Sequence, residues 1–287
     1  MSLKPLALRV GLTALLGMAG AGGAATAASA APTFIVNTVS DADDGACNAA
    51  HCSLREAMNA SNASATASVI TFAIPGAGPH SIVVASPLPQ ISRPVVIDAY
   101  TQPGAAVNTY GAGLGSNAVI KVRLDGALLS AASDGLVIAA DNTKVRGLSV
   151  IAFRGAGMKV ASGTGSVIEG NFIGASPAGG AKTGNSGPGV HLLSSGATVG
   201  GTAAGSRNLL SGNKGPGVLV AGGASGNQVL GNLIGAAATG IVALPNSSHG
   251  VHLQGSGNVV GGTAAGARNV ISGNNGAGVL IGFNSSG

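Results

Sequence analysis

The stretch RNLLSGNKGPGVLV, from Arg207 to Val220, returns 61 residues later as RNVISGNNGAGVLI, from Arg268 to Ile281. A long fixed period is the signature of a repeat architecture, in which similar units stack on one another. Further segments return at the same distance: Gly170–Gly174 as Gly231–Gly235, Gly189–Leu192 as Gly250–Leu253, and Gly200–Gly205 as Gly261–Gly266. The sequence therefore predicts stacked repeats over at least the C-terminal third of the chain.

A shorter spacing lies inside this period. A glycine followed by an aliphatic piece recurs at intervals of 22 to 33 residues, at Gly135, Gly157, Gly189, Gly217, Gly250 and Gly278. The pieces between these glycines alternate β-branched apolar residues with others, which indicates short strands. Such strands cannot bury a face in hairpins, but they can pair in parallel with the next coil, about 4.8 Å away. We predict an all-β chain that forms a parallel β-helix, with two coils in each 61-residue period.

Gly-Asn pairs mark the expected corners between strands. Glycine adopts the positive φ that a sharp bend needs, and the asparagine amide can bond to an asparagine stacked above it. Such a ladder is a structural device and not a ligand site. The expected ladder corners are Asn171, Asn213, Asn232 and Asn274.

Residues 1–30 have the pattern of a secretory signal peptide, with Lys4 and Arg9, an apolar stretch and the small-residue triplet Ala28–Ala30. We expect an exported protein, extracellular or on the outer cell surface, with no membrane span in the mature chain. Loss of these residues lowers the formal net charge from +5 to about +3. This scattered surplus indicates solvated Lys and Arg side chains and no nucleic-acid partner.

Residues 47–62, CNAAHCSLREAMNASN, predict a short helix that caps the first coil. Ser53 and Glu56 match an S-x-x-E capping box, and Leu54 and Met58 share one apolar helical face. A cap is needed because an open coil exposes strand edges and the end of its core.

Cys47 and Cys52 are the two cysteines of the chain. In an exported protein we expect them to form a disulfide. A metal site that includes His51 is the alternative, but two cysteines and one histidine in six residues are too few and too cramped for a typical zinc site.

Three clustered aspartates precede these cysteines. Carboxylates suit calcium, which is the one cofactor that the sequence suggests, although the same side chains can cap turns in a solvated loop. The calcium candidates are Asp41, Asp43 and Asp44.

The segment CSLREAMNASN, residues 52–62, resembles the CSLREA-type segment that precedes right-handed parallel β-helix repeats in secreted bacterial proteins. Residues 80–105 and 115–126 are similar to the stretches that follow it, and the GNFIG and RNLLSGN units to the family's repeats. The resemblance implies a pectate-lyase-like β-helix, secreted or on the cell surface, and no settled activity.

These observations divide the chain into four parts. Residues 1–30 are the expected signal peptide, 31–66 the N-terminal strand and cap, 67–134 the irregular first coils, and 135–287 the regular coils. The chain stops where the register requires another strand, so we expect a truncated chain whose uncapped C-terminal end can associate edge to edge.

Acidic residues decide whether the coil can be an enzyme. Polysaccharide lyases and glycoside hydrolases use carboxylates as acid, base or calcium ligand. No Asp or Glu follows Glu169, so the regular repeats cannot supply a pair. Asp residues just before this point could converge if their coils stack, with Lys or Arg as the base, although their turn-forming neighbours favour a role in corners. The catalytic candidates are Asp125, Asp134, Asp141, Lys144 and Arg146.

His191 and His252 occupy equivalent positions in the repeated GVHL. We expect both on the outer surface, about 10 Å apart, which is too far for joint metal binding. His249 is a close neighbour of His252 in the sequence. Without a carboxylate nearby, these histidines do not indicate a catalytic site.

The sequence favours a scaffold that is structural, adhesin-like or weakly glycan-binding, with cell-surface glycans or other surface proteins as partners. Only 2% of the residues are aromatic, which leaves few rings for sugar stacking. The first alternative is a polysaccharide lyase or glycoside hydrolase. The second is a self-associating surface fibre.

Overall fold

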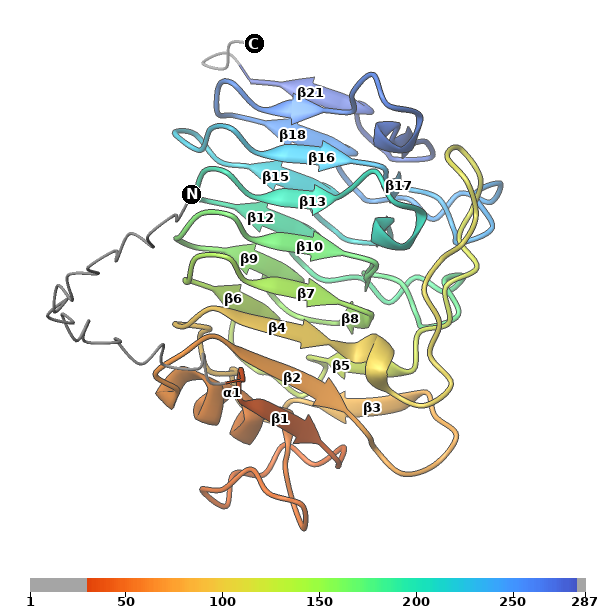
Figure 1. Cartoon of the computed structure of the whole chain (residues 1–287). Helices are drawn as coiled ribbons and strands as arrows, with labels where there is room; N and C mark the ends of the chain where they lie inside the picture. The colour runs from red at the N-terminus through yellow and green to blue at the C-terminus, as the bar shows by residue number, and fades with distance from the viewer. Residues whose placement is uncertain (1–29, 283–287) are drawn as a thin grey trace, which may run out of the picture. The chain divides into compact units, whose positions relative to one another are not determined.

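A computed structural model describes residues 30–282, of which residues 31–282 belong to one compact unit. The chain forms three parallel β-sheets whose strands stack coil upon coil (Figure 1). The predicted right-handed parallel β-helix is confirmed. The expected signal peptide lies outside the described residues except for Ala30.

Successive strands of the later coils belong in turn to the three sheets, whereas the first coils have strands in only two of them. The eight-stranded sheet contains β1 (Thr33–Val36), β2 (Ser68–Phe72), β4 (Val95–Asp98), β7 (Lys144–Arg146), β10 (Val167–Glu169), β13 (Thr198–Gly200), β16 (Gln228–Leu230) and β19 (Val259–Val260). The seven-stranded sheet contains β3 (His80–Val83), β5 (Val122–Asp125), β8 (Leu148–Ile151), β11 (Phe172–Ile173), β14 (Leu209–Leu210), β17 (Leu233–Ile234) and β20 (Val270–Ile271). The six-stranded sheet contains β6 (Leu136–Ile138), β9 (Met158–Val160), β12 (Val190–Leu192), β15 (Val218–Val220), β18 (Val251–Leu253) and β21 (Val279–Ile281).

The repeat in the sequence corresponds to two coils. Strand β12 pairs with β15 and β15 with β18, so that His191 and His252 lie two strands apart at equivalent positions. The recurrent glycines from Gly135 to Gly278 each precede a strand of the six-stranded sheet. The spacing of 22 to 33 residues between these glycines is therefore the length of one coil.

The core consists of aliphatic columns that run along the stack. Six residues on consecutive strands of the eight-stranded sheet are in register and at most 1% exposed: Ile70, Ile97, Val145, Ile168, Val199 and Val229. Burying one such side chain contributes about 1.5–3 kcal/mol. Each coil is thus stabilised mainly by the coils on either side of it.

Two asparagine ladders run through the corners, each longer than the sequence predicted. Direct amide bonds of 2.8–3.4 Å link the members of each ladder. One ladder is Asn171, Asn208, Asn232 and Asn269, and the other is Asn185, Asn213, Asn246 and Asn274. Gly170 and Gly231 precede ladder members and have φ of 64° and 69°, a conformation that favours glycine.

The first coil is covered by helix α1 (Leu54–Ala63), the one α-helix among residues 30–282 (Figure 1). The predicted capping box is present. The Ser53 hydroxyl accepts a bond from the Glu56 N–H at 3.1 Å, and Glu56 Oε2 accepts one from the Ser53 N–H at 2.7 Å. Leu54 and Met58 are buried in the same core cluster as the first coils.

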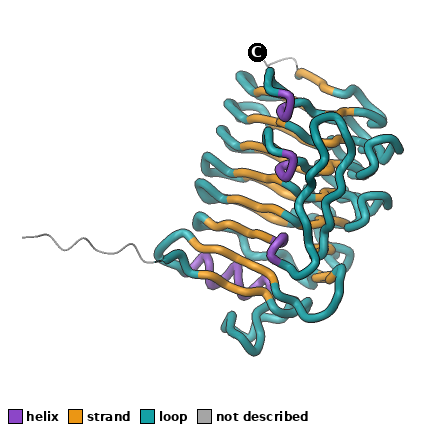
Figure 2. Tube along the Cα trace, turned by 45° about the vertical axis from the view of Figure 1, so that its right-hand side comes forward, coloured by secondary structure: helices purple, strands orange, loops and turns teal. Residues whose placement is uncertain are grey.

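One long loop, residues 102–120, leaves the coil after the short 3-10 helix η1 (Ala99–Thr101) and lies along the next coils (Figure 2). Arg207, which follows the 3-10 helix η2 (Ala204–Ser206), donates to the carbonyl oxygens of Tyr110, Leu114 and Gly115 at 2.6–3.3 Å. Arg268 follows the similar η3 (Ala265–Ala267) and donates to the same loop at 3.2 Å.

Arg207 corrects one sequence-based expectation. Its side chain was expected in solvent, but the residue is 5% exposed, and its guanidinium is surrounded by backbone carbonyl groups of loop 102–120. Burial lowers the pKa of Arg207 below its ordinary value. The charge is retained because arginine stays protonated in proteins, and the carbonyl dipoles replace water around it.

Among residues 30–282, none of the helices combines the length and apolar character that crossing a bilayer requires.

Candidate functional site

Charged side chains gather on the outer face of the eight-stranded sheet. Asp98, Arg146 and Glu169 end strands β4, β7 and β10 and are in register. They point outward because the residue before each is buried in the core and side chains alternate along a strand. Arg146 Nε lies 3.4 Å from Asp98 Oδ1, and Lys144 Nζ lies 3.3 Å from Glu169 Oε1.

Tyr100 completes this outer-face network, which we define as Asp98, Tyr100, Lys144, Arg146 and Glu169. Asp98 Oδ1 accepts a bond from the Tyr100 N–H at 3.0 Å, which caps η1 and places the ring 5.2 Å from the Arg146 guanidinium carbon. The Tyr100 hydroxyl donates to a backbone carbonyl at 2.6 Å. Burial, with Asp98 and Glu169 nearby, raises the pKa of Tyr100 well above its ordinary value despite the Arg146 charge.

The outer-face network lacks a free catalytic group. Its two acids and two bases neutralise one another, and the Tyr100 phenol stays protonated at physiological pH. Glu169 Oε2 also accepts a bond from the Ser206 hydroxyl at 2.8 Å. General base catalysis requires a side chain that is unprotonated and within reach of substrate. The arrangement instead fits a structural ion-pair network, in which each partly exposed pair contributes about 0–1 kcal/mol.

The sequence candidates omitted three members of this network, Tyr100 and the acids Asp98 and Glu169. Both acids close a strand after buried apolar residues, in VVID and SVIE. An acidic residue at the same end of successive strands is the signal that could have found them.

Asp125, Asp134 and Asp141 are not brought together. Asp125 ends β5 of the seven-stranded sheet, Asp134 precedes β6 of the six-stranded sheet, and Asp141 precedes β7 of the eight-stranded sheet. Among the described residues, they are absent from the one cluster of three potential metal ligands. The predicted convergence is therefore not found, and both basic candidates belong to the outer-face network.

Each of these three aspartates instead holds a corner. Asp125 Oδ1 accepts the backbone N–H two residues further on at 3.0 Å. Asp141 Oδ1 accepts the N–H of Thr164 at 2.7 Å. Asp134 Oδ1 accepts a backbone N–H from the next coil at 2.7 Å, and its Oδ2 lies 3.2 Å from Lys159 Nζ. These contacts fit the turn-forming role that their neighbours in the sequence favoured.

A column of polar and apolar side chains runs along the outer face of the six-stranded sheet. Lys159, His191, Leu219 and His252 are in register on β9, β12, β15 and β18. Burial and then the Lys159 charge lower the pKa of His191. Burial and then His249, whose ring lies 5.4 Å away, lower the pKa of His252. Because both pKa values lie below the ordinary value, the imidazoles of His191 and His252 are mainly neutral at pH 7. Strand β15, which lies between β12 and β18, keeps them too far apart for joint action.

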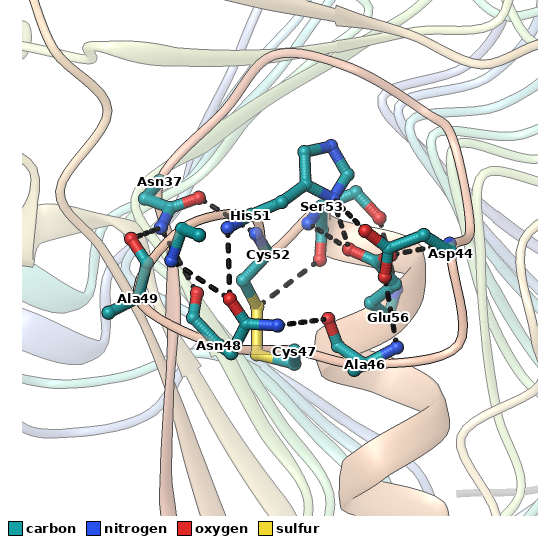
Figure 3. The surroundings of a disulfide bond; sticks show 11 residues. Asn37, Asp44, Ala46, Cys47, Asn48, Ala49, His51, Cys52, Ser53 and Glu56 are labelled. Carbon is teal, nitrogen blue, oxygen red and sulfur yellow. Dashed lines mark hydrogen bonds and ion pairs between the residues drawn. A yellow bond between two sulfur atoms is a disulfide. The ribbon is translucent and has the colours of Figure 1, made fainter.

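The cap contains the predicted Cys47–Cys52 disulfide (Figure 3). The bond excludes both sulfurs as thiolate ligands, so the alternative metal site on these cysteines is not formed. Asn37 anchors the loop from the other side: its amide donates to the carbonyl oxygens of Asn48 and Ala49 at 3.2 and 3.0 Å, and its oxygen accepts the Cys52 N–H at 2.8 Å.

The calcium candidates have separate partners. Asp41 Oδ2 pairs with an arginine of α1 at 2.8 Å, and Asp43 Oδ2 accepts a bond from an asparagine of α1 at 2.8 Å. Asp44 alone belongs to a cluster of potential ligands, together with His51 and Glu56, and this is the one such cluster within residues 30–282. A cage of the three aspartates is therefore not formed in the described cap.

Comparison with protein-family models and with curated protein sequences gave no match. The structure is similar to alginate lyase from Paenibacillus sp. str. FPU-7, with 12% identity, a TM-score of 0.39, and coverage of 79% of this chain and 75% of the lyase. The A-module of the Azotobacter vinelandii mannuronan C-5 epimerase AlgE4 is similar with 17% identity, a TM-score of 0.25, and coverage of 76% of this chain and 80% of the module. Pectate lyase Pel9A is similar with 10% identity, a TM-score of 0.26, and coverage of 90% of this chain and 79% of the lyase. No conclusion about activity follows, because one fold carries many functions.

Proposed function

We propose that this protein is an exported, non-enzymatic β-helix that serves as a structural or adhesin-like scaffold at the cell surface and binds glycans weakly at most. The observation that carries the proposal is the use of the nine acidic residues, all of which lie in the described chain. Each carboxylate accepts a hydrogen bond or ion pair that holds a turn, a cap or a neighbouring coil.

A glycoside hydrolase needs two carboxylates, one of which has a raised pKa and acts as the general acid. Asp44 and Glu56 are two acids that the structure brings together, with ligand oxygens within 4.8 Å of each other. Burial alone would raise the pKa of Glu56, but bonds donated by the Ser53 and Asp44 N–H groups outweigh it and the pKa is lowered. Glu56 is therefore ionised and 2% exposed, which does not suit a general acid.

Two features support export and surface location. A disulfide is typical of proteins outside the reducing cytoplasm. The cap sequence resembles the CSLREA-type segment of secreted β-helix proteins, and we propose membership of that family with residues 1–30 as its signal peptide. Surface glycans or other surface proteins are then the proposed partners.

Two assays test this proposal. Fused to alkaline phosphatase, which folds only outside the cytoplasm, residues 1–66 should give an active reporter, whereas a fusion of residues 31–66 should not. The purified protein, incubated with acidic and neutral polysaccharides with and without calcium, should leave their chain lengths unchanged. An inactive reporter contradicts export, and shortened chains contradict the scaffold.

A lyase remains the second candidate, because Lys144 and Arg146, although paired with Glu169 and Asp98, lie on a sheet face that solvent reaches. The Lys144 side chain is 38% exposed. If this site cleaves polysaccharides, Lys144→Met should abolish the cleavage, whereas Lys121→Met, which removes a lysine just before β5 of the seven-stranded sheet, should not. Self-association at the C-terminal coil stays a prediction that sedimentation at increasing concentration checks.

A further inference from the structure

The cap brings three potential metal ligands to one point beside the disulfide (Figure 3). His51 directly precedes Cys52, so the disulfide and the anchoring asparagine fix its backbone. Glu56 is placed by the capping box, and Glu56 Oε1 accepts the N–H of Asp44 at 2.7 Å. The capping box and its bond to the Asp44 N–H therefore position Glu56 and Asp44, and the disulfide positions His51 separately.

The distances within this group match a small tetrahedral ion. His51 Nδ1 lies 3.0 Å from Glu56 Oε2 and 3.5 Å from Asp44 Oδ2. Zinc bonds nitrogen and oxygen ligands at about 2.0–2.2 Å, and at a tetrahedral angle such bonds separate the donor atoms by about 3.4 Å. Calcium prefers six to eight oxygen ligands, so a site with an imidazole and only two carboxylates favours a zinc-class ion.

Two observations favour a cation bound between these three side chains. His51 Nδ1 is buried and forms no hydrogen bond, although it faces both carboxylates. Within the described chain, no lysine or arginine pairs with Asp44 or Glu56, and His51 is the sole basic partner of the two carboxylates.

We propose that Asp44, His51 and Glu56 bind a zinc-class divalent cation that closes the N-terminal cap. Three protein ligands leave one coordination position for water, and the 56% exposed Asp44 side chain gives the ion a path from solvent. The Ser53 and Asp44 N–H groups that bond to Glu56 orient the carboxylate as outer-shell donors do in zinc proteins. The site stabilises the cap and is independent of whether the coil acts on glycans.

The test titrates the metal-free, disulfide-bonded protein with zinc by calorimetry and with cobalt by visible absorption. The wild type should bind one ion, show the intense visible bands of four-coordinate cobalt, and melt at a higher temperature when zinc is present. His51→Gln and Asp44→Asn should each weaken zinc binding by more than about tenfold. Neither change touches the capping box, so both variants should fold.

Two matched variants serve as controls. Asp43→Asn removes a neighbouring carboxylate that bonds to α1. His249→Gln removes a histidine that packs against His252, far from the cap in the sequence. Asp43→Asn and His249→Gln should both bind zinc as tightly as the wild type does. The proposal is overturned if the wild type gives no zinc-dependent shift in melting temperature, if His51→Gln binds as tightly as the wild type, or if His249→Gln abolishes binding. The first of these results would identify the group as a plain imidazolium–carboxylate ion pair.

Discussion

At the scale of single residues, buried asparagine amides fix how neighbouring coils align. Asn208 is fully buried and joins three coils: its Oδ1 accepts the Asn171 N–H at 2.9 Å, and its Nδ2 donates to Ile168 O at 2.8 Å and to Asn232 Oδ1 at 2.9 Å. In the dry interior of a corner, water cannot replace these partners. The ladder therefore fixes the register between coils as well as their spacing.

Replacement of Asn208 by alanine tests this role. We expect Asn208→Ala to lower the free energy of unfolding by roughly 1–3 kcal/mol for each buried group left without a partner. Urea unfolding followed by circular dichroism measures the change. The control is Gln228→Ala, which removes an exposed amide on β16 of the eight-stranded sheet. Equal losses in the two variants would contradict a structural role for the ladder.

His191 gives the molecule a pH dependence with a definite sign. Its folded pKa lies below the unfolded value of about 6.5, so the unfolded chain takes up the proton first. The free energy of unfolding should fall as the pH decreases from about 6.5 toward the folded pKa. His191→Gln should remove this part of the acid sensitivity, whereas Leu219→Gln, on the next strand of the same column, should retain it. Parallel stability curves for wild type and His191→Gln would contradict the assignment.

At the scale of elements, loop 102–120 is held by one buried cation without a carboxylate partner. Arg207 donates from three nitrogens to backbone carbonyl groups, a geometry that the planar guanidinium provides and a lysine ammonium does not. The loop therefore depends on the identity of this residue and not only on its charge.

Arg207→Lys should loosen loop 102–120 while the coil stays folded. Each hydrogen bond lost from a charged donor costs about 1.5–3 kcal/mol, so limited proteolysis should cut the loop faster than in the wild type. Arg268→Lys is the matched control, because Arg268 is exposed and makes a single bond to the loop, and its effect should be small. Unchanged cleavage in Arg207→Lys would show that other contacts hold the loop.

Features whose partners lie close in the sequence were easier to predict than features whose partners lie far away. The capping box and the disulfide were predictable because their partners lie three and five residues apart. Four ladder corners after glycine were predicted. Four ladder members were missed: Asn185, which also follows glycine, Asn246, which follows proline, and Asn208 and Asn269, which follow arginine. The role of Arg207 could not be predicted, because its partners in loop 102–120 lie 92–97 residues earlier in the chain.

At the scale of the whole molecule, the repeat determines the architecture because each strand pairs with its own equivalent in the next coil. A fixed period in the sequence therefore becomes a fixed register in space, as in the continuous column from Ile70 to Val229. The candidate site was less predictable. Sequence neighbours do not show which acids of different coils face one another, and the structure pairs Asp98 and Glu169 with bases instead of joining Asp125, Asp134 and Asp141.

The central claim is that the acids of this β-helix hold the coil together and perform no chemistry. It is tested most directly by comparing the melting temperature and polysaccharide turnover of Glu169→Gln with those of the wild type. We predict a lower melting temperature for the variant, because Lys144 loses its ionised partner and Arg146 loses one of its two, and no turnover by either protein. A wild type that depolymerises a polysaccharide, beside a folded Glu169→Gln that does not, would contradict the account.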